Sequence, residues 1–535
     1  MANKTYQIKI ESILGGISPM AFFANPTQYR SAIAINPALP IDDFQSVDKP
    51  ATGLLRPSGS VAYGGASLNG TPLWIKGNPK DNILYVYDNV GSTYSVSSST
   101  ISGLGDLNDG GTAGGNGMAY YDNYMYFARD TTVARYGPLN GTPAFTDDYW
   151  VGTLGLTQLS DTQYPVTYSP AGIEYPNHLL HRHSDGRLYI LDVVDNQGTI
   201  HYIQTSKTTV EGDTNNGSTY NKVQVGYGLW PTAVESYGSS LVFAFYEGTI
   251  ASGSSGDRKG NAKVAFWDTV SDKINQLSWV EYPDDFISSI KNVNGILYFT
   301  SGNNRNKGFR VTAYVGGNTF KEVAFFEQGQ VPFNGAVDGN AERLVFGTAT
   351  TFPTQAGVVY SYGLKKAGLG SGLHCIAIAP DAADSLVTAV SLTGGNLLYD
   401  NFTIGWDDNN FPADSGIGLA GGSTYSSSYP SVWESQFYRI GRPFKITKIR
   451  IPLAQPLAAN MVVTPRIYRD GDNFASSFGL TEISTTNYSL STKNIVQRPK
   501  NLTGDYGFYL NLTWTGSALC VIGLPITIEY ELIDD

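Results

Sequence analysis

The amino-acid sequence predicts an all-β protein: a β-propeller of about seven blades followed by a C-terminal, jelly-roll-like β-sandwich. Three observations predict it, namely a composition poor in helix formers, a degenerate strand repeat, and a change of pattern near residue 425. Charged residues make up 15% of the 535, against roughly 25% in an average soluble protein, and 60 glycines and 35 tyrosines are present. Such a composition suits short strands joined by Gly, Asn and Asp turns. With 41% hydrophobic residues, the chain can bury a large core.

The repeat begins with a turn of Asn, Asp or Gly and continues as a strand of the form apolar, Leu, Tyr or Val, aromatic. A partner strand follows most copies, at residues 132–136, 263–267, 310–314 and 358–362. The mean step between copies is about 50 residues, close to the period of four-stranded propeller blades. Aligned on its Leu or Met, the repeat falls at Leu84, Met125, Leu188, Leu241, Leu297, Leu344 and, more weakly, Leu386.

Radial stacking of such blades buries both faces of each twisted sheet, so the repeat predicts a ring over residues 61–425. Seven copies favour seven blades, and six or eight remain alternatives. A large β-sandwich whose hairpins resemble each other by composition is a further alternative. If the ring is correct, the repeat leucines occupy equivalent inner-strand positions.

Residues 1–60 do not fit the repeat and are predicted to form an extended N-terminal arm. Residues 6–10 alternate as a strand, and the stretch up to Pro57 is rich in Pro, Ala and Asn. An extended segment buries too little of itself to become ordered alone. We therefore expect residues 6–10 to pair into a sheet and residues 14–56 to cover a neighbouring subunit. Closure of the ring by an outer strand from the arm is the alternative.

Residues 431–535 are predicted to form the separate β-sandwich. Residues 444–451 alternate between apolar and polar or basic side chains, and further strands are expected at residues 507–512, 519–522 and 526–532. Strands at this spacing, without helical periodicity, suit two packed sheets. Cys375 and Cys520 then lie in different domains, which predicts two reduced thiols and a reducing compartment.

Charge and hydropathy exclude several classes of partner. The net charge is -11 and the pI about 5.0, which argues against a broad nucleic-acid surface. No window of 18 apolar residues occurs, so no membrane insertion is expected. The polar start lacks the apolar core of a signal peptide, which predicts assembly in a cytoplasm.

Motifs for catalysis or metal binding are mostly missing from the sequence, because no G-x-S-x-G, H-E-x-x-H or Walker A pattern occurs. His178, His181 and His183 form H-x-x-H-x-H, but no acidic or cysteine partner follows at a ligand spacing, so we expect a polar hairpin edge rather than a zinc site. Residues 184–186 are similar to part of the Ser-x-Asp-x-Gly turn of sialidase propellers. They occur once, and turn chemistry explains them.

The remaining candidates have structural explanations as well. Cys375 is expected to be a small core residue. Four tryptophans could stack on sugars at loop tips or pack between blades: Trp150, Trp230, Trp406 and Trp433. Three acidic pairs are expected to be solvated turns rather than calcium loops: Asp106/Asp109, Asp407/Asp408 and Asp470/Asp472. The sequence therefore predicts no catalytic, metal-binding or cofactor-binding residue and no cofactor, and it assigns no ligand-binding residue. The carboxylate spacing of a glycosidase depends on the fold, so that activity stays open.

The chain resembles structural proteins of tailed bacteriophages that combine a β-propeller with a C-terminal sandwich. The resemblance rests on LGGIS at residues 14–18, on the Tyr-rich repeat over roughly 60–420, and on WESQFYRIG at residues 433–441 running into ITKIRI at 446–451. It implies a non-enzymatic, tail-associated virion protein, assembled in the host cytoplasm, with other virion proteins and copies of itself as partners. Binding of a host-surface glycan or receptor is the alternative function, followed by a propeller glycosidase.

Overall fold

The structure is a computed structural model that describes residues 4–11, 16–17, 28–33, 35–38, 54–78, 83–107, 117–129, 131–155, 158–159, 178–194, 197–204, 221–247, 261–271, 274, 279–302, 308–326, 331–350, 356–363, 372–380, 385–392, 401–408, 415–421, 430–470 and 477–533. Nearly all regular elements of the described residues are strands. The exceptions in this part of the chain are a π-helical turn, η2 (Tyr149–Thr153), and a 3₁₀ turn, η5 (Asn334–Ala336). Among the described residues, no helix is long and apolar enough to span a membrane.

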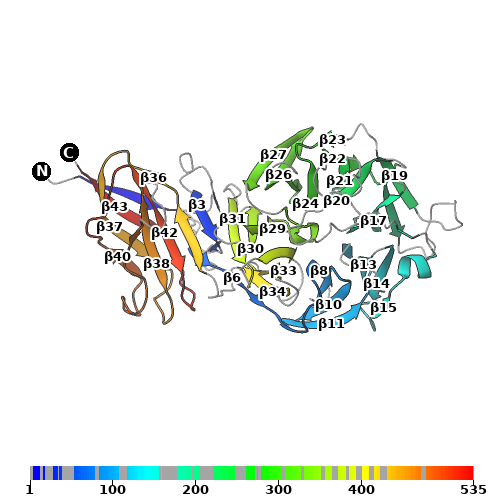
Figure 1. Ribbon diagram of the computed structural model, residues 1–535, viewed down its shortest axis with the longest axis horizontal. Coiled ribbons are helices and arrows are strands. Elements are labelled where there is room, and N and C mark those ends of the chain that lie inside the picture. Colours follow the sequence, from blue (N-terminus) through cyan, green and yellow to red (C-terminus); the bar gives the residue numbers. More distant parts are fainter. Residues whose placement is uncertain are drawn as a thin grey trace.

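A seven-bladed β-propeller forms the larger part of the molecule (Figure 1). The first strands of successive blades contact one another around the ring, so they lie nearest the axis. Blades 1 to 3 comprise β8 (Pro72–Gly77), β9 (Leu84–Asp88), β10 (Ser92–Ser97) and β11 (Thr100–Asp106), with β7 (Gly64–Gly65) added outside; β12 (Gly117–Tyr121), β13 (Tyr124–Arg129), β14 (Thr132–Gly137) and β15 (Ala144–Thr146); and β16 (Leu180–Arg182), β17 (Arg187–Val194), β18 (Gln197–Gln204) and β19 (Asn221–Tyr227).

Blades 4 to 7 complete the ring. They comprise β20 (Leu229–Tyr237), β21 (Ser240–Glu247), β22 (Asn261–Trp267) and β23 (Trp279–Glu281); β24 (Phe286–Val293), β25 (Ile296–Gly302), β26 (Phe309–Gly316) and β27 (Thr319–Phe326); β28 (Val337–Gly339), β29 (Arg343–Thr350), β30 (Ala356–Gly363) and β31 (Gly372–Ile378); and β32 (Ser385–Ser391), β33 (Asn401–Asp408), β34 (Gly416–Gly421) and β6 (Gly59–Ala62). The prediction of an all-β propeller with about seven blades is therefore confirmed.

The sequence repeat marks the second strand in blades 1 to 6 rather than the innermost one. Leu84, Leu188, Leu241, Leu297 and Leu344 pair with the last residues of the first strand in blades 1, 3, 4, 5 and 6, so these positions are equivalent. All five are buried between blades. The predicted partner strands are the third strands, β14, β22, β26 and β30.

The seventh copy of the repeat was assigned to the wrong strand. Leu386 lies in β32, the innermost strand of blade 7, and pairs with Asp407 on the second strand, β33. All seven residues of this strand are buried, and its sequence, SLVTAVS, has apolar residues on both faces. It therefore resembles the second strands of the other blades in composition.

Tight turns explain why Asn, Asp and Gly precede the repeat leucines. In blade 2, Asp122 and Asn123 have φ values of 44° and 66°, and in blade 5, Asn294 and Gly295 have φ values of 51° and 80°. Two successive residues with positive φ match the right-handed twist of the joined strands, and Asn, Asp and Gly adopt this conformation most easily.

Two further sheets face each other across one buried core and form the sandwich. The first contains β1 (Thr5–Ile10), β43 (Ile526–Leu532), β37 (Phe444–Pro452), β40 (Asn494–Gln497) and β41 (Thr503–Gly504). The second contains β2 (Gly16–Ile17), β3 (Gln28–Ile33), β35 (Ser431–Ser435), β42 (Gly507–Trp514), β38 (Val463–Arg469), β39 (Phe478–Gly479) and β36 (Tyr438–Arg439). Alternate residues of β37 and β42, such as Ile449 and Leu510, meet in that core. The jelly-roll-like order of strands stays a prediction.

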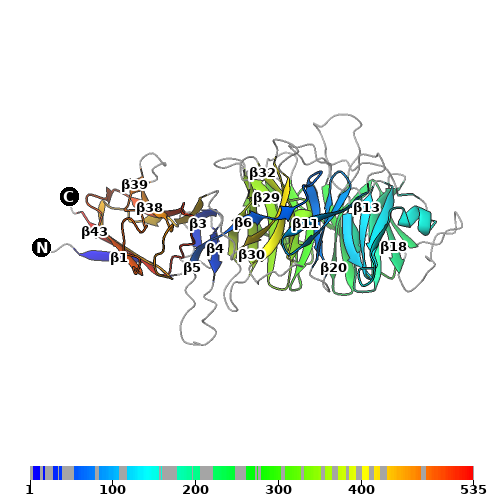
Figure 2. The ribbon, with the colours of Figure 1, turned by 90° about the horizontal axis from the view of Figure 1, so that it is seen from below.

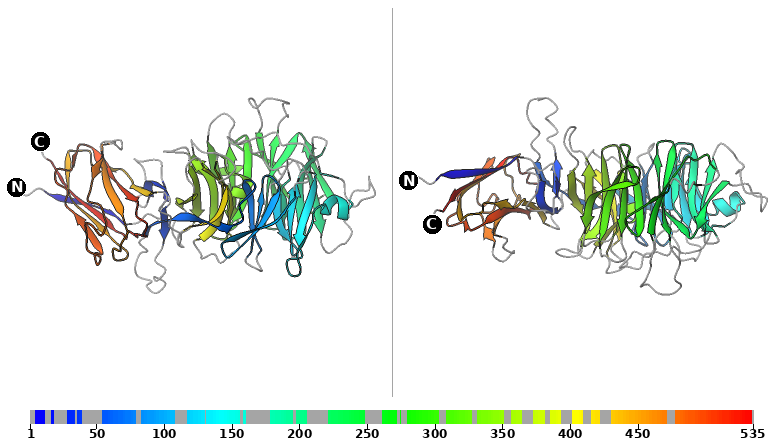
Figure 3. Two further views of the ribbon diagram at one scale, coloured as in Figure 1. Left: turned by 60° about the horizontal axis from the view of Figure 1, so that its bottom comes forward. Right: turned by 90° about the horizontal axis from the view of Figure 1, so that it is seen from above.

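The N-terminal arm confirms the expectation for residues 6–10, which pair into a sheet, and its end supplies the ring-closing strand that was the alternative. Strand β1 pairs with β43 and β3 pairs with β35, while β4 (Ile35–Ala38) and β5 (Leu54–Pro57) form a ribbon, and β6 closes blade 7 on β34. These described strands thus lie in the chain's own sandwich and own ring, where open edges of β43, β35 and β34 accept them, and the covering of a neighbouring subunit by residues 14–56 stays a prediction. Figures 2 and 3 show the sandwich beside the propeller along the long axis, with both termini at the far end of the sandwich.

Candidate functional site

Five innermost strands carry an ionisable side chain at one register position. Each of these residues pairs with the residue that follows the repeat leucine on the second strand. We call the set the axial ring: Lys76, His181, Glu235, Lys291 and Asp338. The acidic and basic members alternate around the ring, with Glu235 in blade 4, Lys291 in blade 5, Asp338 in blade 6 and Lys76 in blade 1. Sequence reasoning missed this ring, although counting back from the repeat leucines across each turn locates it.

The members of the axial ring influence one another's protonation. Burial and, after it, the charge of Lys291 lower the pKa of Lys76 to about 8, against the opposing effects of Asp338 and Glu235. Burial, with Lys291, lowers the pKa of His181 to about 3, so this imidazole is neutral at pH 7. Burial raises the pKa of Glu235, and Lys291 partly offsets the effect. All five side chains are half-buried.

Hydrogen bonds join the ring residues across blade boundaries. Ser236 Oγ lies 2.8 Å from both His181 Nε2 and His183 Nδ1, which links blades 3 and 4. Asn292 Nδ2 donates to the Ser236 carbonyl over 2.9 Å, which links blades 4 and 5. The backbone N–H of Leu392 in blade 7 donates to Asp338 Oδ2 over 2.8 Å. These hydrogen bonds connect adjacent blades near the axis of the ring.

The three histidines of the H-x-x-H-x-H motif do not converge. His178 points away from His181 and His183, into blade 3, where its Nε2 lies 3.0 Å from Asp192 Oδ1. His201 Nε2 lies 3.1 Å from the other carboxylate oxygen of Asp192. Among the described residues, no group of three His, Cys, Asp or Glu side chains could hold a metal ion.

Asp192 is a buried carboxylate that sequence reasoning missed. Burial alone would raise its pKa, but the hydrogen bonds from His178 and His201 outweigh burial and hold the pKa well below its ordinary value. The carboxylate is therefore ionised, and each imidazole donates to it through Nε2. Trp150 packs edge-on against His201, with ring centroids 5.7 Å apart. The only sequence signal for this cluster is an Asp four residues after a repeat leucine.

The other sequence candidates take structural roles. All four singled-out tryptophans are buried, at most 4% exposed, so none forms an open platform for a sugar: Trp150, Trp230, Trp406 and Trp433. Cys375 in blade 6 and Cys520 in the sandwich are buried and form no disulfide. Asp185 accepts from the backbone N–H of Arg187 over 3.0 Å, and Gly186 has a φ of 81°, so residues 184–186 form a hairpin turn.

The acidic pairs likewise stabilise turns where they are described. Asp470 accepts backbone N–H bonds from residues 505–507, which lower its pKa against the effect of burial. Asp407 accepts from Ser415 Oγ over 2.8 Å. Asp106 ends β11. Asp109, Asp472 and the side chain of Asp408 lie outside the described residues.

One short segment connects the sandwich to the ring, and we call residues 54–62 the junction segment. Leu55 is fully buried in the sandwich core, and its backbone exchanges hydrogen bonds of 3.0 and 3.1 Å with Ile522. A few residues later, the hydroxyls of Ser58 and Ser60 donate to the carbonyls of Ile376 and Ile378 on the outer strand of blade 6. β6 then completes blade 7. The junction segment therefore contacts the sandwich and two blades in succession.

Comparison with known proteins gives the fold and no family. No model of a known protein family matches the sequence, and no curated protein matches it. Among solved structures, the chain is similar to the WD40 domain of Pan2 from Neurospora crassa (10% identity, 69% of this chain and 96% of that chain, TM-score 0.40). It is also similar to the β-propeller domain of Cps50 (Swd1) from Myceliophthora thermophila (9% identity, 68% of this chain and 99% of that chain, TM-score 0.41). A third similar structure is Raptor from Chaetomium thermophilum (10% identity, 69% of this chain and 29% of that chain, TM-score 0.41). At this identity the likeness concerns the fold alone.

Proposed function

We propose that the chain is a non-enzymatic structural protein of a tailed-bacteriophage virion, tail-associated, that acts as a rigid assembly and interaction scaffold. Its partners in this proposal are other virion proteins and copies of itself, and it assembles in the host cytoplasm. The resemblance of the arm, the repeat and the 433–451 region to such proteins motivates the proposal. The acidic net charge of -11 fits partners that are proteins rather than nucleic acid.

The observation that carries the proposal is the junction segment. Two domains joined by an ordinary linker are free to change orientation. Here the connection is fixed by a backbone bridge at Leu55, two buried serine hydrogen bonds and a strand that belongs to the ring. In addition, β31 of blade 6 contacts β2, β3 and β4. A scaffold needs this property, because it must present two binding surfaces at a constant separation.

The test uses particles from cells infected by a phage that carries the gene. We expect mass spectrometry of purified particles to detect the protein at a stoichiometric ratio to known tail components. An insertion of Gly-Ser-Gly-Ser after Pro57 separates the two bodies without removing either core. We expect the variant to fold, by circular dichroism and thermal melting, but to enter particles at least tenfold less than the wild type.

The matched control is the same insertion after Ser489, in an exposed turn of the sandwich. This control should enter particles normally. Absence of the protein from purified particles would contradict the virion role. Normal incorporation of the junction variant would contradict the rigid-scaffold role.

A further inference from the structure

The guanidinium of Arg135 on β14 is flanked by two aromatic rings. Its Cζ lies 4.2 Å from the centre of the Tyr124 ring and 3.8 Å from the centre of the Tyr149 ring. Its Nε is buried and forms no hydrogen bond with a described residue. The three side chains are half-buried, so part of this group is at the surface where blade 2 faces blade 3.

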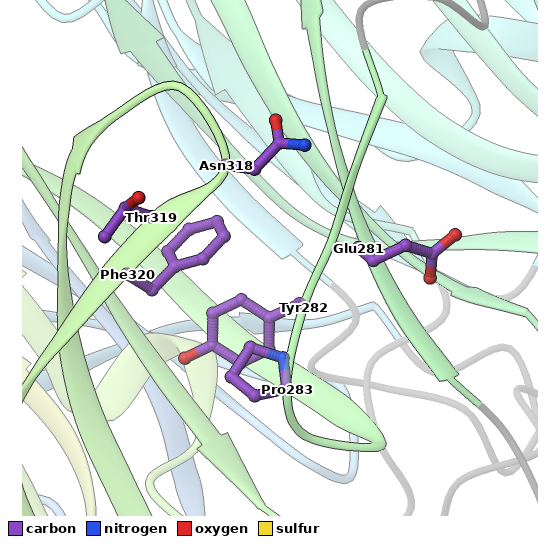
Figure 4. A pocket seen from close by; sticks show the side chains of 6 residues that line it. All are labelled: Glu281, Tyr282, Pro283, Asn318, Thr319 and Phe320. Atoms are coloured by element: carbon purple, nitrogen blue, oxygen red, sulfur yellow. The ribbon is translucent and has the colours of Figure 1, made fainter.

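Three other half-buried cations of the propeller have carboxylate partners. The pairs are Lys263 Nζ with Glu247 Oε2 and Glu281 Oε1 (2.8 and 3.6 Å), Arg310 Nε with Asp284 Oδ2 (3.4 Å), and Arg187 Nη1 with Asp185 Oδ2 (3.7 Å). Figure 4 shows the Glu281 carboxylate at the rim between blades 4 and 5, pointing away from the rings of Tyr282 and Phe320. Arg135 differs from these cations, because no described carboxylate forms an ion pair with it.

A third tyrosine holds the two flanking rings in place. Tyr126 is 1% exposed, and its ring centre lies 6.3 Å from that of Tyr124 and 5.8 Å from that of Tyr149. Burial raises the pKa of Tyr126, and the nearby Arg135 partly offsets the effect. Because these contacts fix the rings and the guanidinium in advance, a ligand that binds there removes little side-chain freedom from the protein.

The arrangement around Arg135 selects a class of ligand. A guanidinium is planar, and its N–H groups match the two oxygens of a carboxylate or a phosphate. Because rings flank the guanidinium, a ligand meets it through the N–H edge. Asp147 and Asp148 are exposed beside Tyr149, so a phosphate dianion is repelled more strongly than a carboxylate with one charge. The Thr132 hydroxyl donates to Asp148 Oδ1 over 2.7 Å, which holds that carboxylate in place.

We propose that Arg135 is a binding site for a carboxylate of a partner protein, the side chain of an Asp or a Glu. The carboxylate accepts hydrogen bonds from the N–H edge, while Tyr124 and Tyr149 keep the guanidinium in position. One ion pair near solvent contributes little affinity alone, so the partner makes further contacts on blades 2 and 3. The site is separate from the junction segment, so it adds a recognition function that a rigid scaffold does not require.

The test is NMR of the full chain labelled with ¹⁵N-arginine, in which the Nε–Hε signal of Arg135 is followed. Arg135→Lys removes this signal and thereby assigns it. The probes are the peptide acetyl-Gly-Glu-Gly-amide, its matched Gln peptide and inorganic phosphate, all at constant ionic strength. We expect the Glu peptide to shift the signal saturably below about 100 mM, and the other two probes to bind at least about fivefold more weakly.

Two variants and an internal control accompany the titration. Tyr149→Leu and Tyr124→Leu each remove one flanking ring and should weaken binding of the Glu peptide about fivefold. The control is Arg187 in the same spectra, whose Cζ lies 4.5 Å from the Tyr202 ring centre and which is already paired with Asp185. Its signal should not move. Thermal melting verifies the fold of each variant.

Four results would overturn the proposal. These are an unmoved Arg135 signal at about 100 mM Glu peptide, equally tight binding of the Gln peptide or phosphate, an equal shift of the Arg187 signal, and unchanged affinity in both ring variants. Each result leaves the scaffold proposal untouched, because Arg135 lies in blade 2, whereas the junction segment contacts the sandwich and blades 6 and 7.

Discussion

Blades 1 and 3 carry an aspartate at the same place, four residues after the repeat leucine on the second strand, and hold it with different partners. Asp88 in blade 1 accepts the backbone N–H groups of Ser92 and Val90 over 2.7 and 3.1 Å, and the Tyr94 hydroxyl over 3.2 Å. Asp192 in blade 3 accepts from two imidazoles. Both carboxylates are at most 1% exposed.

The two environments shift the carboxyl pKa in opposite directions. Burial raises the pKa of Asp88 to about 6, because its neutral donors only partly compensate. For Asp192, burial is outweighed by the hydrogen bonds from His178 and His201, and the pKa of the carboxyl is lowered. Equal burial at equal positions therefore does not decide the charge state; the donors that the neighbouring strands supply decide it.

The position itself tolerates many side chains. Blades 4, 5 and 6 place Phe245, Ser301 and Thr348 there, and all three are buried. The repeat consequently requires a side chain that fits between blades, and the polar identity of the residue is specific to each blade.

The largest expected effect comes from Asp192→Asn. The two imidazole N–H groups then face an amide with a single acceptor oxygen, and one buried donor loses its partner. We expect the free energy of unfolding to fall by about 3 kcal/mol at pH 7, because hydrogen bonds to a buried carboxylate are lost and one buried imidazole N–H is left without an acceptor. Guanidinium unfolding followed by tryptophan fluorescence measures this free energy of unfolding.

Asp505→Asn, at an exposed position, is the control and should change stability by less than about 0.5 kcal/mol. A loss under about 1 kcal/mol would show that the cluster is dispensable.

Asp88→Asn tests whether the pKa of the Asp88 carboxyl is raised, as opposed to the lowered pKa of Asp192. The folded-state pKa of Asp88 is about 6, above its ordinary value of 3.8, so its contribution to stability is fully present below pH 3.8 and is lost as the pH rises through 6. The amide cannot ionise, so the variant should gain about 2 kcal/mol relative to the wild type on going from pH 4 to pH 7.5. Urea unfolding at both pH values measures the difference. A variant that loses stability relative to the wild type over this range contradicts the raised pKa.

The stability that Asp192 contributes should increase with rising pH, whereas that of Asp88 decreases. Its lowered folded-state pKa provides stability above the ordinary aspartate pKa of 3.8, and this stability is lost as the pH falls below that value. In a comparison of the wild type with Asp192→Asn, the stability gap should therefore narrow by at least about 1 kcal/mol between pH 6 and pH 3. Thermal melting across this range provides the measurement, and a constant gap contradicts the assignment of an ionised Asp192.

The smallest expected effect is that of Tyr94→Phe, which removes one donor from ionised Asp88. The pKa of Asp88 should rise above 6, and the free energy of unfolding at pH 7 should fall by about 1 kcal/mol. Part of this loss arises because the backbone N–H of Asn69 no longer has the Tyr94 hydroxyl as its acceptor. NMR titration of the Asp88 carboxyl carbon measures the pKa. An unchanged pKa would mean that the backbone donors alone set it.

The sequence by itself determined the features that consecutive residues encode. The period of the repeat predicts the second and third strands of the blades, and Asp122–Asn123 and Asn294–Gly295 specify turns that only a few residue types adopt. Alternation over residues 444–451 likewise predicts β37 of the sandwich, because side chains on a strand point to alternate faces.

Only the tertiary structure decided how distant segments pair. The closing strand β6 has four residues and no distinctive pattern, and its neighbour Ser58 bonds to a carbonyl 318 residues away. Leu386 belongs to an innermost strand that resembles a second strand in composition. Asp192 acquires its charge state from His178 and His201, and the axial ring exists only once five blades meet. Open strand edges and the charges of buried groups depend on neighbours that the local sequence does not specify, which is why the sequence predicted the propeller but offered its closure by the arm only as an alternative.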